Sequence, residues 1–181
     1  RPGMTLCVTV MRDEAPRLLL AGKEAAVGHE IEEGLAFFAG EQAEYFTLYD
    51  HTAVAVKSVS ERLRIGGPAT SKCAWIPEFI AHVETGSPVT GGNPAPCDFV
   101  STHAYPSDLA FLNSAEGSVE LQSSTIMYDL FSRVRSQMDN SSLKGLPLIM
   151  GEWNSSAGPC AWNHDEKNNG AFLAKTLIEL R

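Results

Sequence analysis

Basic residues and long apolar runs are both scarce in this sequence. Its 181 residues include 14 Lys and Arg against 22 Asp and Glu, which gives a formal net charge of −8 at pH 7. The basic residues form no cluster, so we expect no nucleic-acid partner. No stretch approaches the roughly 18 consecutive apolar residues that a membrane-spanning helix needs, so we expect no membrane partner.

Cysteine is also sparse, and its spacing excludes two kinds of site. Cys7, Cys73, Cys97 and Cys160 lie far apart and form no CxxC pair. This spacing fits neither a zinc site nor a dense disulfide framework. We therefore predict buried free thiols.

Nucleotide-binding glycine motifs are missing as well. Neither GxGxxG nor GxxxxGK[ST] follows any predicted strand, which argues against the nucleotide-binding open sheets. We expect no cofactor and no bound metal. With 44% hydrophobic residues the chain can still form one domain with a sizeable core.

From residue 41 onward, the apolar pattern alternates between helices and strands. Apolar residues at spacings of three and four predict helices, and short apolar runs predict the strands between them. The predicted helices are 41–63, 75–84, 125–138 and 165–181, and the predicted strands lie in "LRIGGP" (63–68), 99–102 and 146–150. This alternation predicts parallel β-α units, either in a (β/α) barrel or in an open doubly wound sheet.

In both architectures the functional face lies at the carboxyl ends of the strands. The residues that follow the three predicted strands are Gly66 to Pro68, then His103 and Tyr105, then Glu152, Trp153 and Asn154. Aromatic rings with polar groups suit a sugar, which has apolar faces and hydroxyl edges. A carboxylate at such a strand end can attack an anomeric carbon.

Each of these residues also has a purely structural interpretation. A glutamate after a strand is most often a loop residue or a charge at a helix N-terminus. His103 could cap a neighbouring element, and Tyr105 with Pro106 could form a plain turn. A metal site of His103 with His164 or Asp165 is conceivable, although no recognised ligand spacing supports it.

Several longer segments resemble a known family. "RIGGPATS", "DFVSTHAYPSD" and "LPLIMGEWNSS" are similar to the successive strand-end motifs of glycoside hydrolase family 39, which holds β-xylosidases and α-L-iduronidases. The resemblance runs from about residue 35 to the end. It implies a partial (β/α)8 TIM barrel of roughly the strand 4–8 region, formed by residues 35–181. Residues 1–34 form an atypical N-terminal segment without a family counterpart.

The resemblance also implies roles for the strand-end residues. Glu152 matches the nucleophile of a retaining mechanism, although Gly151 stands where the family usually has threonine. His103 and Tyr105 match the pair that lines the sugar subsite, with the phenol near the nucleophile. Trp153 and Asn154 complete the family's "EWN" motif and are expected to bind substrate.

The second catalytic carboxylate is where the sequence departs from the family. The family carries Trp-Asn-Glu-Pro-Asn just before its "L-x-F-F/W" segment, which is "LAFF" here (35–38). Counting back places Glu32 on the acid/base. Ile31 and Glu33 replace the neighbouring asparagine and proline. We expect a fragment, or a coding sequence altered near residue 34.

The expected function follows from these matches. It is hydrolysis of terminal β-xylosides or related glycosides by a retaining double displacement, with a carbohydrate as the partner. The alternative is a truncated, inactive barrel fragment that at most binds sugar weakly. Four β-α units are too few to close a barrel of eight strands, and open sheet edges favour self-association. The sequence contains no signal peptide and leaves the localisation open between cytoplasmic and secreted.

Overall fold

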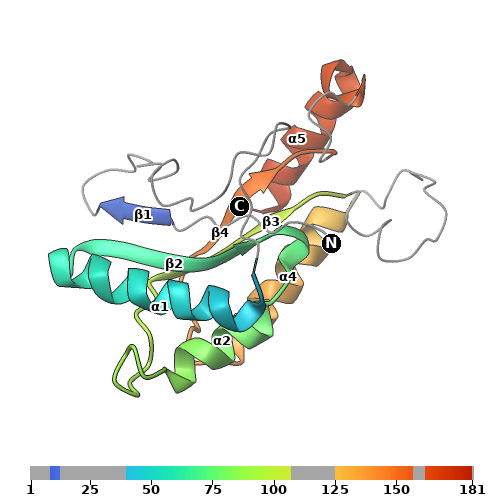
Figure 1. Cartoon of the computed structure of the whole chain (residues 1–181). Helices are drawn as coiled ribbons and strands as arrows, with labels where there is room; N and C mark the ends of the chain where they lie inside the picture. Colours follow the sequence, from blue (N-terminus) through green and yellow to red (C-terminus); the bar gives the residue numbers. More distant parts are fainter. Residues whose placement is uncertain (1–8, 13–39, 107–124, 157–161, 181) are drawn as a thin grey trace.

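The computed structural model describes residues 9–12, 40–106, 125–156 and 162–180 (Figure 1). The described strands form one four-stranded sheet in the order β1-β2-β3-β4. The strands are β1 (Thr9–Arg12), β2 (Leu63–Thr70), β3 (Phe99–Ala104) and β4 (Leu148–Trp153). The helices are α1 (Gln42–Val59), α2 (Ile76–Thr85), α4 (Ile126–Asp139) and α5 (Lys167–Glu179), with 3-10 turns η1 (Ser71–Cys73) and η2 (Trp162–Asp165).

Strands β2, β3 and β4 are parallel and are linked by helices, as the alternating pattern predicts. β2 pairs with β3 through Gly66↔Phe99, and β3 pairs with β4 through Val100↔Leu148. The carboxyl ends of all three strands therefore meet at one rim of the sheet. This arrangement confirms the α/β class.

Strand β1 differs, because it runs antiparallel to β2, with Val10 opposite Ile65. It lies in the atypical N-terminal segment and occupies the edge of β2 (Figure 1). A (β/α) barrel is built of parallel strands only. β1 therefore departs from the pattern of parallel β-α units that the rest of the described sheet follows.

Helix α1 is shorter than its apolar pattern predicts. It begins with a capping box, in which the backbone N–H of Glu41 donates to Glu44 Oε2 at 2.7 Å. It ends at Ser60, which has extended backbone angles. The predicted extension to Leu63 is wrong because Leu63 already belongs to β2, whose apolar residues continue the helical spacing by coincidence.

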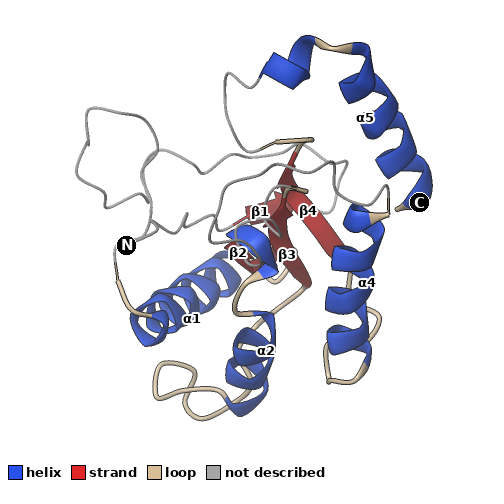
Figure 2. Cartoon of the chain, turned by 90° about the vertical axis from the view of Figure 1, so that its right-hand side faces the viewer, coloured by secondary structure: helices blue, strands red, loops and turns tan. Residues whose placement is uncertain are grey.

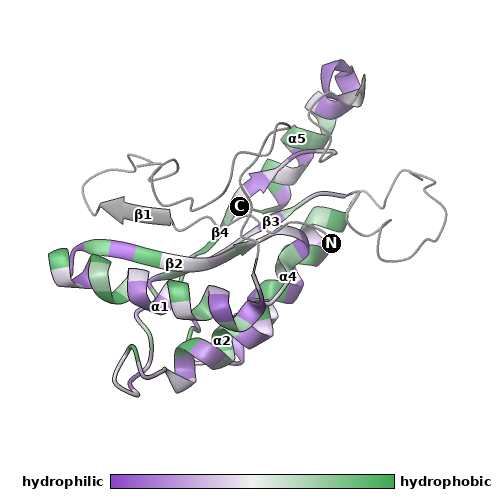
Figure 3. Ribbon diagram, viewed as in Figure 1, coloured by the Kyte–Doolittle hydropathy of each residue, from purple (hydrophilic) through white to green (hydrophobic). Residues whose placement is uncertain are grey.

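The hydrophobic core lies between the sheet and the helices α1, α2 and α4, which cover one face of it (Figures 1 and 2). The hydropathy colouring shows hydrophobic and hydrophilic residues mixed along these helices (Figure 3), as amphipathic helices require. The largest fully buried apolar side chains are Tyr45, Tyr49, Phe79, Phe99, Ile65, Ile76, Met138, Val100 and Val134. Packing of this face fixes the sheet on which the rim residues stand.

The two glycines of "LRIGGP" do not end a strand. Gly66 and Gly67 lie inside β2, so the expectation that Gly66 to Pro68 follow the strand is wrong. A Cβ at Gly66 would lie 2.1 Å from the carbonyl oxygen of Phe99, and one at Gly67 would lie 3.3 Å from the Tyr49 ring. Glycine here allows the close approach of β3 and α1, and the strand continues to Thr70.

Strand β4 is less buried than its apolar sequence predicts. All six residues of β3 are buried, whereas Leu148 to Met150 are half-buried and Gly151 and Glu152 are exposed. The apolar run "LPLIM" is typical of a parallel strand buried on both faces, and β4 departs from that pattern because it is an edge strand of the described sheet. An edge strand has a neighbour on one side only.

Two cysteines lie within the described residues, and both are free thiols as predicted. Cys73 is buried and Cys97 is half-buried, and burial raises the pKa of Cys97 to about 11. Cys7 and Cys160 lie outside the described residues. Within the described part of the chain, no helix combines the length and apolarity needed to cross a membrane.

Candidate active site

Three of the residues singled out from the sequence meet at the carboxyl rim of the sheet. The hydroxyl of Tyr105 donates a hydrogen bond to Glu152 Oε1. His103 Nδ1 lies 3.4 Å from Glu152 Oε2. Two adjacent strands thus place a phenol and an imidazole on the two oxygens of one carboxylate. The Glu152 side chain is 54% exposed and His103 is buried. The carboxylate therefore contacts a buried imidazole and is also accessible to solvent.

A bulge in β4 produces this alignment. Thr102 pairs with Met150, and the next residue, His103, pairs with Glu152. Gly151 is therefore the extra residue of a β-bulge, which locally twists the strand and redirects the side chains that follow. Without the extra residue, the partner of His103 would be residue 151, and residue 151 carries no side chain.

The end of β3 is braced by the segment that follows β2. Thr102 Oγ1 donates to the carbonyl oxygen of Thr70 at 2.9 Å, and Cys73 Sγ lies 3.9 Å from the carbonyl oxygen of His103. Thr70 Oγ1 in turn donates to the carbonyl oxygen of Ala74. These contacts hold the backbone on which His103 stands. Nothing local in the sequence around Thr70, Cys73 and Thr102 indicates this bracing role, because it depends on contacts between segments far apart in the chain.

The bracing segment contains strained backbone. Ala69, Lys72, Cys73 and Trp75 all have positive φ angles between 50° and 61°. Each such angle costs of the order of 1 kcal/mol in a residue other than glycine, and such strain concentrates at functional sites. Its place beside the carboxyl rim agrees with the position of the candidate site.

The imidazole is the group whose proton affinity the site changes. Burial lowers the pKa of His103 from its ordinary value of 6.5, and the nearby Glu152 carboxylate opposes that shift without cancelling it. His103 is thus mainly neutral near pH 7. The tautomer with the proton on Nδ1 directs that proton toward Glu152 Oε2.

The other two residues of the "EWN" motif have contacts of their own. The ring of Trp153 lies 6.3 Å from that of Phe172 on α5 and borders the hydrophobic core. Asn154 Oδ1 accepts a hydrogen bond from the backbone N–H of Ser155 at 2.8 Å. These contacts do not involve the Glu152 carboxylate, and the contact of both residues with substrate stays a prediction.

The remaining sequence candidates are Glu32 and the metal ligands. Glu32 lies outside the described residues, so its role as the second carboxylate stays a prediction. His164 Nε2 lies 3.2 Å from the carbonyl oxygen of Ser156. Among the residues that the structure describes, no three His, Cys, Asp or Glu side chains are grouped as metal ligands, so the alternative of a metal site gains no support.

Comparison with known proteins identifies the family. The profile described as "Glycosyl hydrolases family 39" matches residues 33–181. The chain belongs to glycoside hydrolase family 39. Its match begins one residue after Glu32 and contains every rim residue described above.

Curated and solved beta-xylosidases are also similar to this chain. The chain is 39% identical over 144 residues to a beta-xylosidase from Caldicellulosiruptor saccharolyticus, and the matched segment covers 80% of this chain and 28% of that protein. It is 36% identical to a beta-xylosidase from Geobacillus stearothermophilus, and that match covers 75% of this chain and 27% of that protein. A monomeric beta-xylosidase from Caulobacter crescentus superimposes with a TM-score of 0.65 at 35% identity over 78% of this chain and 28% of that one.

These comparisons also show how much of its relatives' length this chain covers. It spans little more than a quarter of the length of the curated beta-xylosidases it matches. The α/β sheet with parallel strands is consistent with part of a family 39 TIM barrel.

Proposed function

We propose that this chain carries the nucleophile half of a retaining β-xylosidase site, with Glu152 as the nucleophile. In this reaction the carboxylate attacks the anomeric carbon of a terminal β-xyloside or related glycoside and expels the aglycone. Water then hydrolyses the glycosyl-enzyme intermediate. Such a nucleophile must be ionised and rigidly placed, and its oxygen must remain open to the substrate.

The observation that carries the proposal is the arrangement of Glu152, His103 and Tyr105. The phenol of Tyr105 donates a hydrogen bond to Glu152 Oε1, which fixes the orientation of the carboxylate. The neutral imidazole supplies a second polar contact without adding a competing acid. The Glu152 side chain is 54% exposed, which leaves the carboxylate accessible to a sugar bound at the rim.

The acid that protonates the leaving group is proposed to be Glu32. Retaining enzymes place the two carboxyl groups about 5–5.5 Å apart. General acid catalysis contributes about 10²–10⁴-fold, so a misplaced acid would leave slow turnover on natural glycosides. Aryl glycosides with good leaving groups depend least on that acid.

The test is pre-steady-state release of aryl alcohol from an activated aryl β-xyloside. We expect a burst with the wild-type chain and none with Glu152→Gln, which removes the charge but keeps the shape. Glu61→Gln is the matched control, because Glu61 is exposed in the turn between α1 and β2, at the opposite end of that strand. Equal bursts in wild type and Glu152→Gln would contradict the assignment.

The second candidate function is a fragment that binds sugar weakly without hydrolysing it. The half-buried edge strand β4 and the short span relative to the relatives favour this alternative. A sample that releases no aryl alcohol but shows xylose-dependent tryptophan fluorescence, lost in Glu152→Gln, would favour binding over hydrolysis. Lack of any response would remove both candidates.

A further inference from the structure

We infer that Gly151 sets the position of the His103 imidazole, and through it the way the rim contacts a sugar. The inference rests on the proposed function and extends it to a residue with no reacting group of its own. It makes Gly151 a positioning and specificity-determining residue.

The first observation is that the backbone does not require glycine at this position. Four glycines of the described chain have positive φ angles, namely Gly86, Gly91, Gly92 and Gly145, and Gly151 is not among them. Any residue could adopt its backbone conformation. The reason for glycine must therefore lie in the space that a side chain would fill.

The second observation identifies that space. A Cβ at position 151 would lie 3.3 Å from His103 Nε2 and 3.4 Å from His103 Cδ2. Both distances are shorter than the 3.5–4.0 Å of an ordinary contact between heavy atoms. On the opposite side of the same ring, Nδ1 lies 3.4 Å from Glu152 Oε2. The imidazole is thus enclosed between residues 151 and 152 of the bulge.

The third observation is that the ring has little room to retreat. His103 is 5% exposed, its carbonyl oxygen is in contact with Cys73 Sγ, and its neighbour Thr102 is hydrogen-bonded to Thr70. A methyl group at position 151 would therefore press the imidazole along the bulge and change its contact with Glu152. Gly151 itself is exposed, and glycine places no side-chain atom against the Nε2 edge of the ring.

This arrangement gives the imidazole two separate tasks. Nδ1 faces the carboxylate, while Nε2, which accepts a hydrogen bond in the Nδ1–H tautomer, can accept one from a sugar hydroxyl. A side chain at position 151 would cover Nε2. We expect Gly151 to favour substrates with a hydroxyl group that reaches His103, and a larger residue to weaken that selectivity.

The test substitutes Gly151 by Ala and by Thr and follows the His103 ring by long-range ¹H–¹⁵N NMR, with His103→Gln to assign the signals. Both variants should lower the pKa of His103 further, by about 0.5 unit or more, because the added methyl excludes water from the cation and loosens its contact with Glu152. Gly170→Ala is the control, since nothing lies within 4 Å of a Cβ there. It should leave the His103 titration unchanged.

A kinetic measurement separates positioning from simple destabilisation. With an aryl β-xyloside, Gly151→Ala should raise KM about fivefold or more while it preserves the burst amplitude, since Nε2 acts on binding. An aryl deoxy-xyloside that lacks the hydroxyl group reaching His103 should show no difference in KM between the variant and wild type.

The possible results distinguish this inference from the proposed function. An unchanged His103 titration in Gly151→Ala would overturn the inference, whatever the activity. A shifted titration together with a normal burst in Glu152→Gln would uphold the positioning of His103 and remove the nucleophile assignment. A shifted titration with equal KM values on both substrates would overturn the role in specificity.

Discussion

At the scale of single residues, the site depends on how strongly burial acts on one imidazole. His103 lies on a fully buried strand, and burial outweighs the attraction of the Glu152 carboxylate, so the pKa of His103 is lowered from 6.5. In the unfolded chain this pKa returns to its ordinary value. Between the folded and unfolded pKa values, the unfolded state binds the extra proton, so the stability of the fold rises with pH in that window.

This difference predicts that the folded chain loses stability as pH falls below about 6.5, and that the loss levels off below the lowered folded pKa. His103→Gln should reduce this part of the pH dependence, because glutamine does not titrate. Urea unfolding at a series of pH values measures the effect. His51→Gln is the control, since His51 is exposed on α1, and an identical pH profile for the two variants would contradict the prediction.

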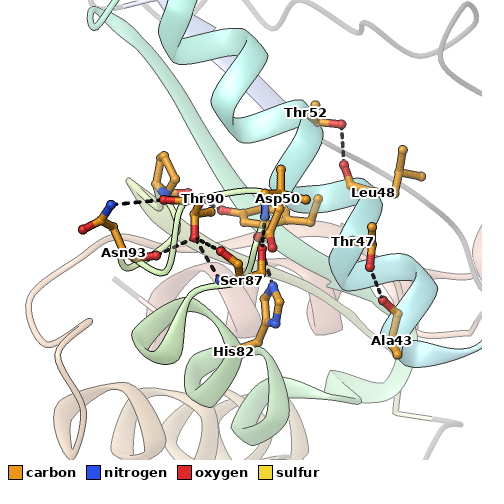
Figure 4. A network of polar contacts seen from close by, with 12 residues as sticks. Ala43, Thr47, Leu48, Asp50, Thr52, His82, Ser87, Thr90 and Asn93 are labelled. Carbon is orange, nitrogen blue, oxygen red and sulfur yellow. Dashed lines mark hydrogen bonds and ion pairs between the residues drawn. The ribbon is translucent and has the colours of Figure 1, made fainter.

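At the scale of elements, a buried polar pair joins the first two helices of the core. Asp50 of α1 is fully buried, and its Oδ1 lies 3.0 Å from Nε2 of His82 on α2 (Figure 4). The ring of Phe46 stacks on His82 with centroids 4.7 Å apart. Asp50 Oδ2 has no hydrogen-bond partner within the described residues, so His82 carries most of the compensation for burying this carboxylate.

Removal of the histidine should therefore cost more than its packing alone. We expect His82→Ala to lower the free energy of unfolding by about 1–3 kcal/mol beyond the loss of packing, because Asp50 would be left unpaired. The double variant Asp50→Leu with His82→Leu should cost less than the sum of the two single variants. Denaturant titration of all variants, with exposed His51→Ala as the control, measures this coupling, and strict additivity would exclude it.

At the scale of the whole molecule, the described sheet has two edges that differ. The edge of β2 is covered by the antiparallel β1, whereas β4 is the other edge strand. Leu148 and Met150 of β4 border the helix-side core, while Ile149 is half-buried and outside that cluster. Exposed apolar side chains on α5, Leu177 and Ile178, add to the apolar surface of this part of the chain.

Within the described residues, β4 has a strand partner on one side only, and such an edge favours pairing with another chain. We predict that the isolated chain self-associates through β4, with a concentration-dependent mass in size-exclusion chromatography with light scattering. Ile149→Lys should shift the mass toward the monomer, because an edge lysine opposes strand addition. Val59→Lys at the exposed end of α1 is the control, and equal self-association of both variants would contradict the role of β4.

The sequence by itself determined the order of elements and the residues of the rim. The alternation of helices and strands from residue 41 onward follows from local apolar periodicity and turn residues. The placement of His103, Tyr105 and Glu152 at the ends of β3 and β4 follows from the same signals. These features depend on neighbours along the chain, which a single sequence displays directly.

Only the tertiary structure decided how the rim residues meet. The bulge at Gly151, the bracing of His103 by Thr70 and Cys73, and the antiparallel direction of β1 depend on pairing between strands far apart in sequence. Strand register and burial are set by contacts across the sheet, and those contacts leave no periodic signal in either strand alone. For the same reason the apolar run of β4 predicted burial that an edge strand does not have.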